Sequence, residues 1–123
     1  MSSASTDDQA EALLRRAYEA FNARDVDAVV ALMHPDVNWP NAFEGGRARG
    51  HDEVRAYWTR QFAQIDPTVT PQAFTRRPDG RIAVDIHQVV RSPSGEVLSD
   101  GAVVHVYALR DGLVERMDVE PAG

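Results

Sequence analysis

Apolar residues recur at helical spacing in three stretches of the first half of the chain. The first helix should run from about Asp7 to Ala23, and its apolar positions are Ala10, Leu13, Leu14, Ala17, Tyr18 and Phe21. A second, short helix is expected after Asp25, a favourable N-cap, and it should end before Pro35. A third helix is expected from Asp52 to about Ile65, where the following Asp-Pro pair should end it.

The second half of the chain alternates apolar and polar residues with a period of two. The alternation is clearest over residues 81–90, and it returns at 97–109 and 113–119 after two turns that contain glycine. A looser version covers residues 70–75, and a brief strand is expected at 37–39. The glycine-rich segment 41–50 is expected to be a loop, with a short strand near Arg47.

Helices in the first half of the chain and strands in the second indicate the α+β fold class. In that class, helices cover one face of a curved sheet, here expected to be an antiparallel meander. A length of 123 residues suffices for one hydrophobic core. We therefore expect residues 1–123 to form a single domain, with a mobile tail over about residues 1–5.

Composition narrows the classes of partner. With 13 Lys and Arg against 19 Asp and Glu, the formal charge is −6, which opposes nonspecific binding to nucleic acid or anionic membranes. No cysteine is present, so disulfides, thiolate metal sites and a cysteine nucleophile are excluded. No apolar run approaches the roughly 18 residues that would span a bilayer. We therefore expect a cytoplasmic protein that binds neither nucleic acid nor membranes.

Three segments carry a resemblance to a known family. They are residues 18–39, which contain YEAFNARDVDAVVAL and PDVNW, residues 46–58, GRARGHDEVRAYW, and residues 107–114, YALRDGLV. They resemble the SnoaL-like branch of the nuclear transport factor 2-like superfamily, which includes ketosteroid isomerase. The resemblance covers roughly Leu13 to Val119.

The resemblance implies a cone-shaped, curved sheet that wraps around the helices and encloses an apolar, hydrophobic pocket. It also implies one or two acid/base residues on strand positions that face the pocket. The general base of ketosteroid isomerase falls on Asn41, its oxyanion-hole tyrosine on Ala17 and its oxyanion-hole aspartate on His105. Asparagine takes up no proton at neutral pH and alanine has no donor, so these positions depart from steroid isomerase chemistry.

His105 is the leading candidate for acid/base chemistry. Strand alternation places Val103, His105 and Tyr107 on one face, which the resemblance turns toward the pocket. An imidazole there could move a proton near neutral pH, although burial would lower its pKa. The alternative is a structural histidine whose ring is hydrogen-bonded to a backbone carbonyl or to Tyr107.

Asp85 and His87 form a second candidate pair. They share a face of one strand, and hairpin pairing could bring that face beside His105, giving either a supported base or a two-His, one-carboxylate metal site. Binary patterning opposes this, because the alternate positions 82, 84, 86 and 90 make the more apolar face, which should turn inward. We take His105, Asp85 and His87 as candidate catalytic residues and expect no metal and no cofactor.

A further set of residues is expected to bind substrate. Tyr18 and Asn41 could orient a substrate oxygen, although Asn41 could equally be a turn residue and the aromatic members ordinary core. The set is Tyr18, Trp39, Asn41, Tyr57, Trp58, Phe62, Val103 and Tyr107.

Two functions are compatible with these features. The first is a small-molecule acid/base enzyme of isomerase, cyclase or dehydratase type that acts on a compact apolar, carbonyl-containing substrate. The alternative is a noncatalytic small-ligand-binding or dimeric assembly module of the same fold. In either case we expect a homodimer through the sheet.

Overall fold

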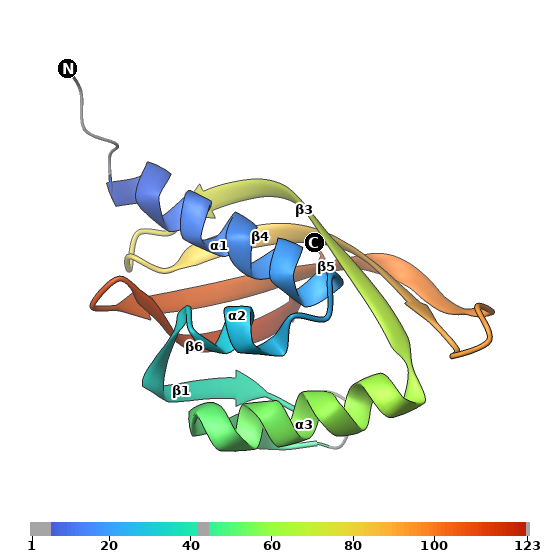
Figure 1. The fold of residues 1–123 in the computed structure, drawn as a ribbon. Coiled ribbons are helices and arrows are strands. Elements are labelled where there is room, and N and C mark those ends of the chain that lie inside the picture. The colour runs from blue at the N-terminus through green and yellow to red at the C-terminus, as the bar shows by residue number, and fades with distance from the viewer. Residues whose placement is uncertain (1–5, 42–44, 123) are drawn as a thin grey trace.

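A computed structural model describes residues 6–41 and 45–122 (Figure 1). The tail expected over residues 1–5 lies outside these residues. The described residues form three helices: α1 (Thr6–Asn22), α2 (Val26–Val30) and α3 (Gly50–Gln64). None of the helices in the described ranges is both long enough and apolar enough to cross a membrane.

The helix ends show which local signals were interpreted correctly. Asp25 is the N-cap of α2, as expected, since its carboxylate accepts a hydrogen bond from the backbone N–H of Ala28. Helix α3 begins at Gly50, two residues before the expected start at Asp52. Its first turn is stabilised from inside the helix, because the carboxylate of Glu53 accepts a hydrogen bond from the backbone N–H of Arg49.

Within the part of the chain that the structure describes, six strands form one sheet in the order β2-β1-β6-β5-β4-β3. Five of the expected strands are confirmed, and the short strand near Arg47 is also present. Strand β1 is longer than expected, because it begins within the segment that was expected only to end a helix. The strands are β1 (Met33–Pro40), β2 (Arg47–Arg49), β3 (Asp66–Arg76), β4 (Ile82–Arg91), β5 (Val97–Arg110) and β6 (Leu113–Pro121).

The sheet is mixed rather than wholly antiparallel. Strand β1 pairs in parallel with β6, whereas every other neighbouring pair is antiparallel. The meander of β3 to β6 was expected from its turns, but a pairing between strands far apart in the sequence leaves no local signal. The register shifts in β3–β4, β4–β5 and β5–β6, and such irregularities bend a sheet.

The helices cover the inner face of the curved sheet. Helix α1 crosses this face in front of β3, β4 and β5, and α3 runs alongside β1 (Figure 1). The core lies between these layers, and its fully buried members come from both: Leu14, Val30, Val37, Val54, Trp58, Val84, Ile86 and Val114. The α+β class and the cone-shaped arrangement are thereby confirmed.

One side chain joins α1 to the sheet. The Asn22 amide donates to the carbonyl of Val69 at 2.8 Å, and its oxygen accepts from the N–H of the same residue at 3.0 Å. Arg24 adds an ion pair with Asp66 and a hydrogen bond to the carbonyl of Pro67 at 2.6 Å. The start of β3 is therefore fixed against the C-terminal end of α1.

Candidate functional site

A small cavity of about 60 Å³ lies between α1 and the inner face of the sheet. Helix α1 contributes one face of its last turns, and β5 contributes two alternate residues that point the same way. The remaining wall comes from α2, α3, β1 and the start of β3. The lining residues are Ala17, Tyr18, Phe21, Val29, Trp39, Trp58, Val69, His105 and Tyr107.

Strand register explains why His105 points inward. Val84 of β4 lies opposite His105 and Ile82 lies opposite Tyr107, so these four side chains share one face. Val84 and Ile82 are buried, which identifies that face as the inner one. His105 itself is only 7% exposed.

Aromatic rings form the walls of the cavity. Trp39 meets Trp58 edge to face with ring centroids 5.5 Å apart, and it lies 6.3 Å from the ring of Tyr107. Phe21 also meets Trp58 edge to face, at 5.5 Å. Such packing holds flat apolar surfaces around the cavity while leaving few polar atoms on it.

Three polar side chains that line the cavity form one connected group. The Tyr107 hydroxyl donates to the Tyr18 hydroxyl at 2.6 Å, and the Tyr18 hydroxyl lies 2.8 Å from Nδ1 of His105. We call these three side chains the hydroxyl–imidazole array. With Tyr107 as the first donor, Tyr18 donates to Nδ1, and the ring proton of His105 is therefore on Nε2.

Burial keeps the whole array uncharged. It lowers the pKa of His105 from 6.5 to about 4, because an imidazolium would lose its hydration inside the protein. Burial also raises the pKa of Tyr18 well above 10.0, and the neighbouring Tyr107 raises it further. Burial raises the pKa of Tyr107 too, against the opposing effect of its hydrogen bond to Tyr18. At neutral pH the array is a neutral set of donors and acceptors.

Five of the expected site residues therefore meet at the cavity, and six do not. The five are Tyr18, Trp39, Trp58, His105 and Tyr107.

The expectation for Asp85 and His87 needs correction. Because Val84 is the residue opposite His105, Asp85 and His87 lie on the other face of the sheet. Asp85 is exposed, and His87 pairs with Asp100 through Nε2 at 2.6 Å. The physical reason is the one that patterning indicated: turning Ile82, Val84 and Ile86 inward buries three branched apolar side chains.

No metal site results from these residues. Among the residues that the structure describes, no three His, Asp or Glu side chains are placed to hold a metal ion together. The two-His, one-carboxylate alternative fails because the two histidines lie on opposite faces of the sheet.

Four expected substrate-binding residues lie away from the cavity. Tyr57 is buried in the core, where its hydroxyl accepts a hydrogen bond from Gln61. Phe62 packs edge to face on Phe21, and Val103 is packed against the core without reaching the cavity. Asn41 is buried and adopts the turn role, since its backbone bonds to the glycines of the β1–β2 connection.

Four lining residues were not proposed as site residues. Ala17 and Phe21 belong to the apolar stripe of the first helix, so the period of that helix could have identified them. Ala17 lines the cavity at the position where the family resemblance implies a tyrosine, while the hydroxyl is supplied by its neighbour Tyr18. No sequence pattern could have identified Val69 as a lining residue, because its position at the cavity depends on its hydrogen bonds with Asn22.

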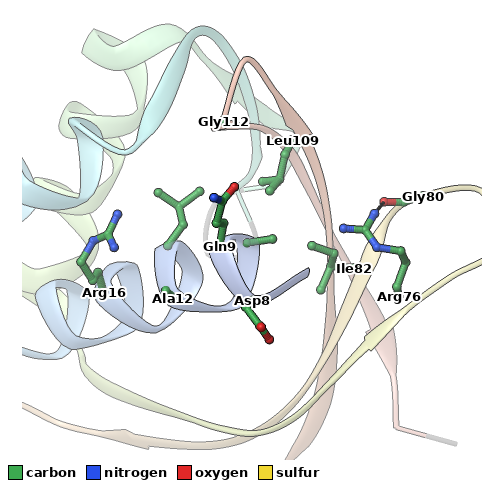
Figure 2. A pocket seen from close by; sticks show the side chains of 11 residues that line it. Asp8, Gln9, Ala12, Arg16, Arg76, Gly80, Ile82, Leu109 and Gly112 are labelled. Atoms are coloured by element: carbon green, nitrogen blue, oxygen red, sulfur yellow. Dashed lines mark hydrogen bonds between the residues drawn. The ribbon is translucent and has the colours of Figure 1, made fainter. Parts of the chain in front are cut away.

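A larger cleft of about 630 Å³ opens elsewhere, beside the first turns of α1 (Figure 2). It shares no lining residue with the cavity. We place the candidate site in the cavity because only the cavity contains the hydroxyl–imidazole array.

Comparison with known proteins identifies the family. A sequence model of the SnoaL-like domain matches residues 14–117. The chain belongs to the SnoaL-like domain family. No curated protein sequence matches the chain.

Solved structures of the same fold support this membership. An NTF2-like protein of unknown function from Burkholderia pseudomallei is 27% identical with a TM-score of 0.80, covering 93% of this chain and 91% of that one. TerC co-crystallised with polyporic acid is 24% identical with a TM-score of 0.80, covering 93% and 92%. A Mycobacterium tuberculosis protein in complex with estradiol-17β-hemisuccinate is 22% identical with a TM-score of 0.77, covering 90% and 92%.

Proposed function

We propose that this SnoaL-like chain is a cofactor-independent acid/base enzyme that moves a proton on a compact apolar, carbonyl-containing molecule bound in the cavity. The reaction class is isomerisation, cyclisation or dehydration. The observation that carries the proposal is the hydroxyl–imidazole array, a buried neutral histidine held by two tyrosines at an apolar cavity.

The array can serve proton transfer in either direction. With the ring proton on Nε2, His105 donates a hydrogen bond to a substrate carbonyl oxygen. For proton abstraction the array must reverse: His105 donates through Nδ1 to the Tyr18 hydroxyl, and Tyr18 donates to the Tyr107 hydroxyl. Nε2 then has a free lone pair and accepts a proton from a carbon next to the carbonyl. The C–H electron pair then moves into an enolate, and Nε2–H returns the proton to a second carbon, which completes an isomerisation.

The low pKa of His105 limits the range of substrates from which it can remove a proton. An imidazole with a pKa of about 4 is neutral at neutral pH, so in the reversed array it can act as a base, but it is a weak one. It suits carbon acids that are activated twice, for example by a carbonyl and an adjacent double bond. A simple ketone would hold its proton too tightly.

The size of the cavity also bears on the substrate. Ligand pockets commonly enclose about 300–1,000 Å³, so a cavity of about 60 Å³ accepts a molecule of more than a few atoms only when side chains move. We propose that rings of the aromatic wall rotate outward as the substrate enters. Two relatives of the same fold support a small-molecule ligand, since they were solved with polyporic acid and with estradiol-17β-hemisuccinate.

Cyclohex-3-en-1-one is a suitable probe, because its C2 protons lie between a carbonyl and a double bond. Incubation in D₂O separates two steps by NMR: deuterium at C2 reports proton abstraction, and cyclohex-2-en-1-one reports reprotonation at C4. We expect the protein to accelerate both steps above the buffer rate. His105→Ala should return both to the buffer rate, and Tyr18→Phe should reduce them.

Two matched variants serve as controls. His87→Ala removes a histidine from the outer face of the sheet, and Tyr57→Phe removes a buried hydroxyl outside the cavity. Both should keep the rate of the unmodified protein. Catalysis that survives His105→Ala in a folded variant, or no acceleration by any form of the protein, would overturn the enzymatic proposal.

A noncatalytic binding module is the second candidate, favoured by one observation. The positions of the ketosteroid isomerase base and tyrosine hold Asn41 and Ala17, and the lining of the cavity contains no carboxylate. If the probe shifts the NMR resonances of His105 but neither deuteration nor isomerisation exceeds the buffer rate, the binding function is the correct one.

We also propose a homodimer through the sheet. Val97 and Leu98 of β5 and Val119 of β6 are 52%, 54% and 45% exposed, and a second copy of the chain packed against the sheet would remove this apolar surface from water. Light scattering measures the mass directly. A monomer of 13.6 kDa at high protein concentration would contradict the dimer.

A further inference from the structure

The cleft beside the first turns of α1 has the form of a second ligand site. Its volume of about 630 Å³ lies within the usual range for small-molecule pockets, whereas the cavity that holds His105 is about 60 Å³. Both the cleft and the cavity are lined in part by α1. The residues of α1 that line the cleft extend to Arg16, and those that line the cavity begin at Ala17. Fully buried Leu14 belongs to neither lining.

One side of the cleft is apolar. Ala10 and Leu13 come from α1, Ile82 from the start of β4 and Leu109 from the end of β5. The first three are at most 6% exposed, and Leu109 packs against the same core. Figure 2 shows Ile82 and Leu109 on the sheet side of the cleft. A ligand here would therefore rest on a firm apolar surface that belongs to the core.

The rim of the cleft carries positive charge. Arg16 lies on the helix side and Arg76 beyond Ile82, where its Nη1 donates to the carbonyl of Gly80 at 2.8 Å (Figure 2). Arg16 is exposed and forms no ion pair with any residue in the described part of the chain. Its neighbour Arg15, by contrast, pairs with Glu11 at 2.9 Å.

Asp8 limits the charge that the cleft accepts. It also lines the cleft, eight residues before Arg16, which corresponds to about 12 Å along the helix axis. Its carboxylate would repel a second negative charge at that end. The cleft therefore suits a molecule with one anionic group near Arg16 and an apolar body that extends away from it.

We propose that this cleft binds an amphipathic monocarboxylate, whose carboxylate pairs with Arg16 while its apolar body covers Ala10, Leu13, Ile82 and Leu109. This site is separate from the cavity and does not depend on the proposed enzymatic function. The guanidinium offers two parallel N–H groups to a carboxylate, a geometry that a neutral alcohol cannot use.

Binding of 1-naphthoate, compared with the neutral 1-naphthalenemethanol, tests the proposal. Calorimetry gives the affinity, and backbone amide shifts locate the ligand: those of Ala10 and Gly112 report the cleft, and those of Val69 and Tyr107 report the cavity. We expect 1-naphthoate to bind more tightly than the alcohol and to shift the cleft amides.

Three variants sharpen the test. Arg16→Gln should weaken 1-naphthoate roughly three- to tenfold and leave the alcohol unchanged. Arg91→Gln makes the same change in net charge at the other end of β4, about 30 Å from Ile82, and should have no effect. Ala12→Phe fills the cleft from an exposed helix position and should weaken both probes.

Several results would overturn the site. They are an absence of binding at millimolar probe, shifts confined to the cavity amides, equal affinity for the acid and the alcohol, or equal losses in Arg16→Gln and Arg91→Gln. Unchanged binding in a folded Ala12→Phe variant would do the same. Circular dichroism confirms that each variant remains folded.

Discussion

At the scale of single residues, the environment of His105 decides both stability and chemistry. On the outer face the same imidazole would be partly exposed to solvent and paired with a carboxylate, as that of His87 is. In the array it is buried, neutral and bonded to a phenol hydroxyl. The alternation along its strand and the family resemblance together predicted that its side chain faces inward, as the register with Val84 places it. The state of its proton depends on Tyr18, which is 87 residues away in the chain.

The depressed pKa of His105 makes the stability of the fold depend on pH. The folded-state pKa of about 4 lies below the unfolded value of about 6.5, so between these values the unfolded chain binds a proton that the folded one does not. This contribution is complete above pH 6.5 and is lost as the pH falls toward 4, by up to about 3 kcal/mol. Urea unfolding at several pH values measures it.

The window between pH 5 and 6.5 isolates this effect. Folding lowers the pKa of Asp118 from its usual value of 3.8, mainly through the hydrogen bond to Arg116. The carboxyl group therefore takes up its proton below this pH window, and its effect on stability appears only at lower pH. In the variant His105→Gln the slope of stability against pH should be smaller in this window than in the unmodified protein. An unchanged slope in that variant would show that His105 is not buried in its neutral form.

At the scale of elements, local signals predicted most helices and strands, and tertiary contacts decided the rest. Asp25 caps α2 as its side chain suggests, but α3 starts early because Glu53 reaches back to the N–H of Arg49. The apolar period of β4 predicted its inner face, which holds Val84. The expectation that Asp85 and His87 join the site required the opposite face to turn inward, and the register contradicts it. Turning the apolar face of a strand inward removes several side chains from water at once. The free energy gained in this way decides the orientation of the strand more strongly than any single polar residue on it.

The junction between α1 and β3 depends on one side chain. Asn22→Ala removes both hydrogen bonds to Val69 and should lower the free energy of unfolding by about 1–3 kcal/mol. Asn22→Asp keeps the acceptor for the Val69 N–H but places a carboxylate oxygen, which cannot donate, against the Val69 carbonyl, so in neutral solution its loss should be at least as large. Urea unfolding of both variants gives the values, and an unchanged stability in Asn22→Ala would show that the junction is held elsewhere.

At the scale of the whole molecule, sequence indicated the α+β class and the enclosed space but not its dimensions. The parallel pairing of β1 with β6 joins segments more than 70 residues apart, and neither strand shows it locally. The division of the space under α1 into a small cavity and an open cleft likewise follows from side chains of α1, β4 and β5 packed together. Asn41, Tyr57, Phe62 and Val103 were assigned to the site because a resemblance fixes the fold but not the volume within it.

The placement of the two tryptophans has a spectroscopic consequence. The chain contains two, Trp39 and Trp58, and both line the cavity, in contact with each other. The tryptophan fluorescence of the protein therefore originates entirely at the cavity wall. A molecule that enters beside His105 should change the tryptophan emission, whereas one bound along the first turns of α1 should leave it unaltered. A fluorescence titration of the unlabelled protein therefore distinguishes binding at the two sites.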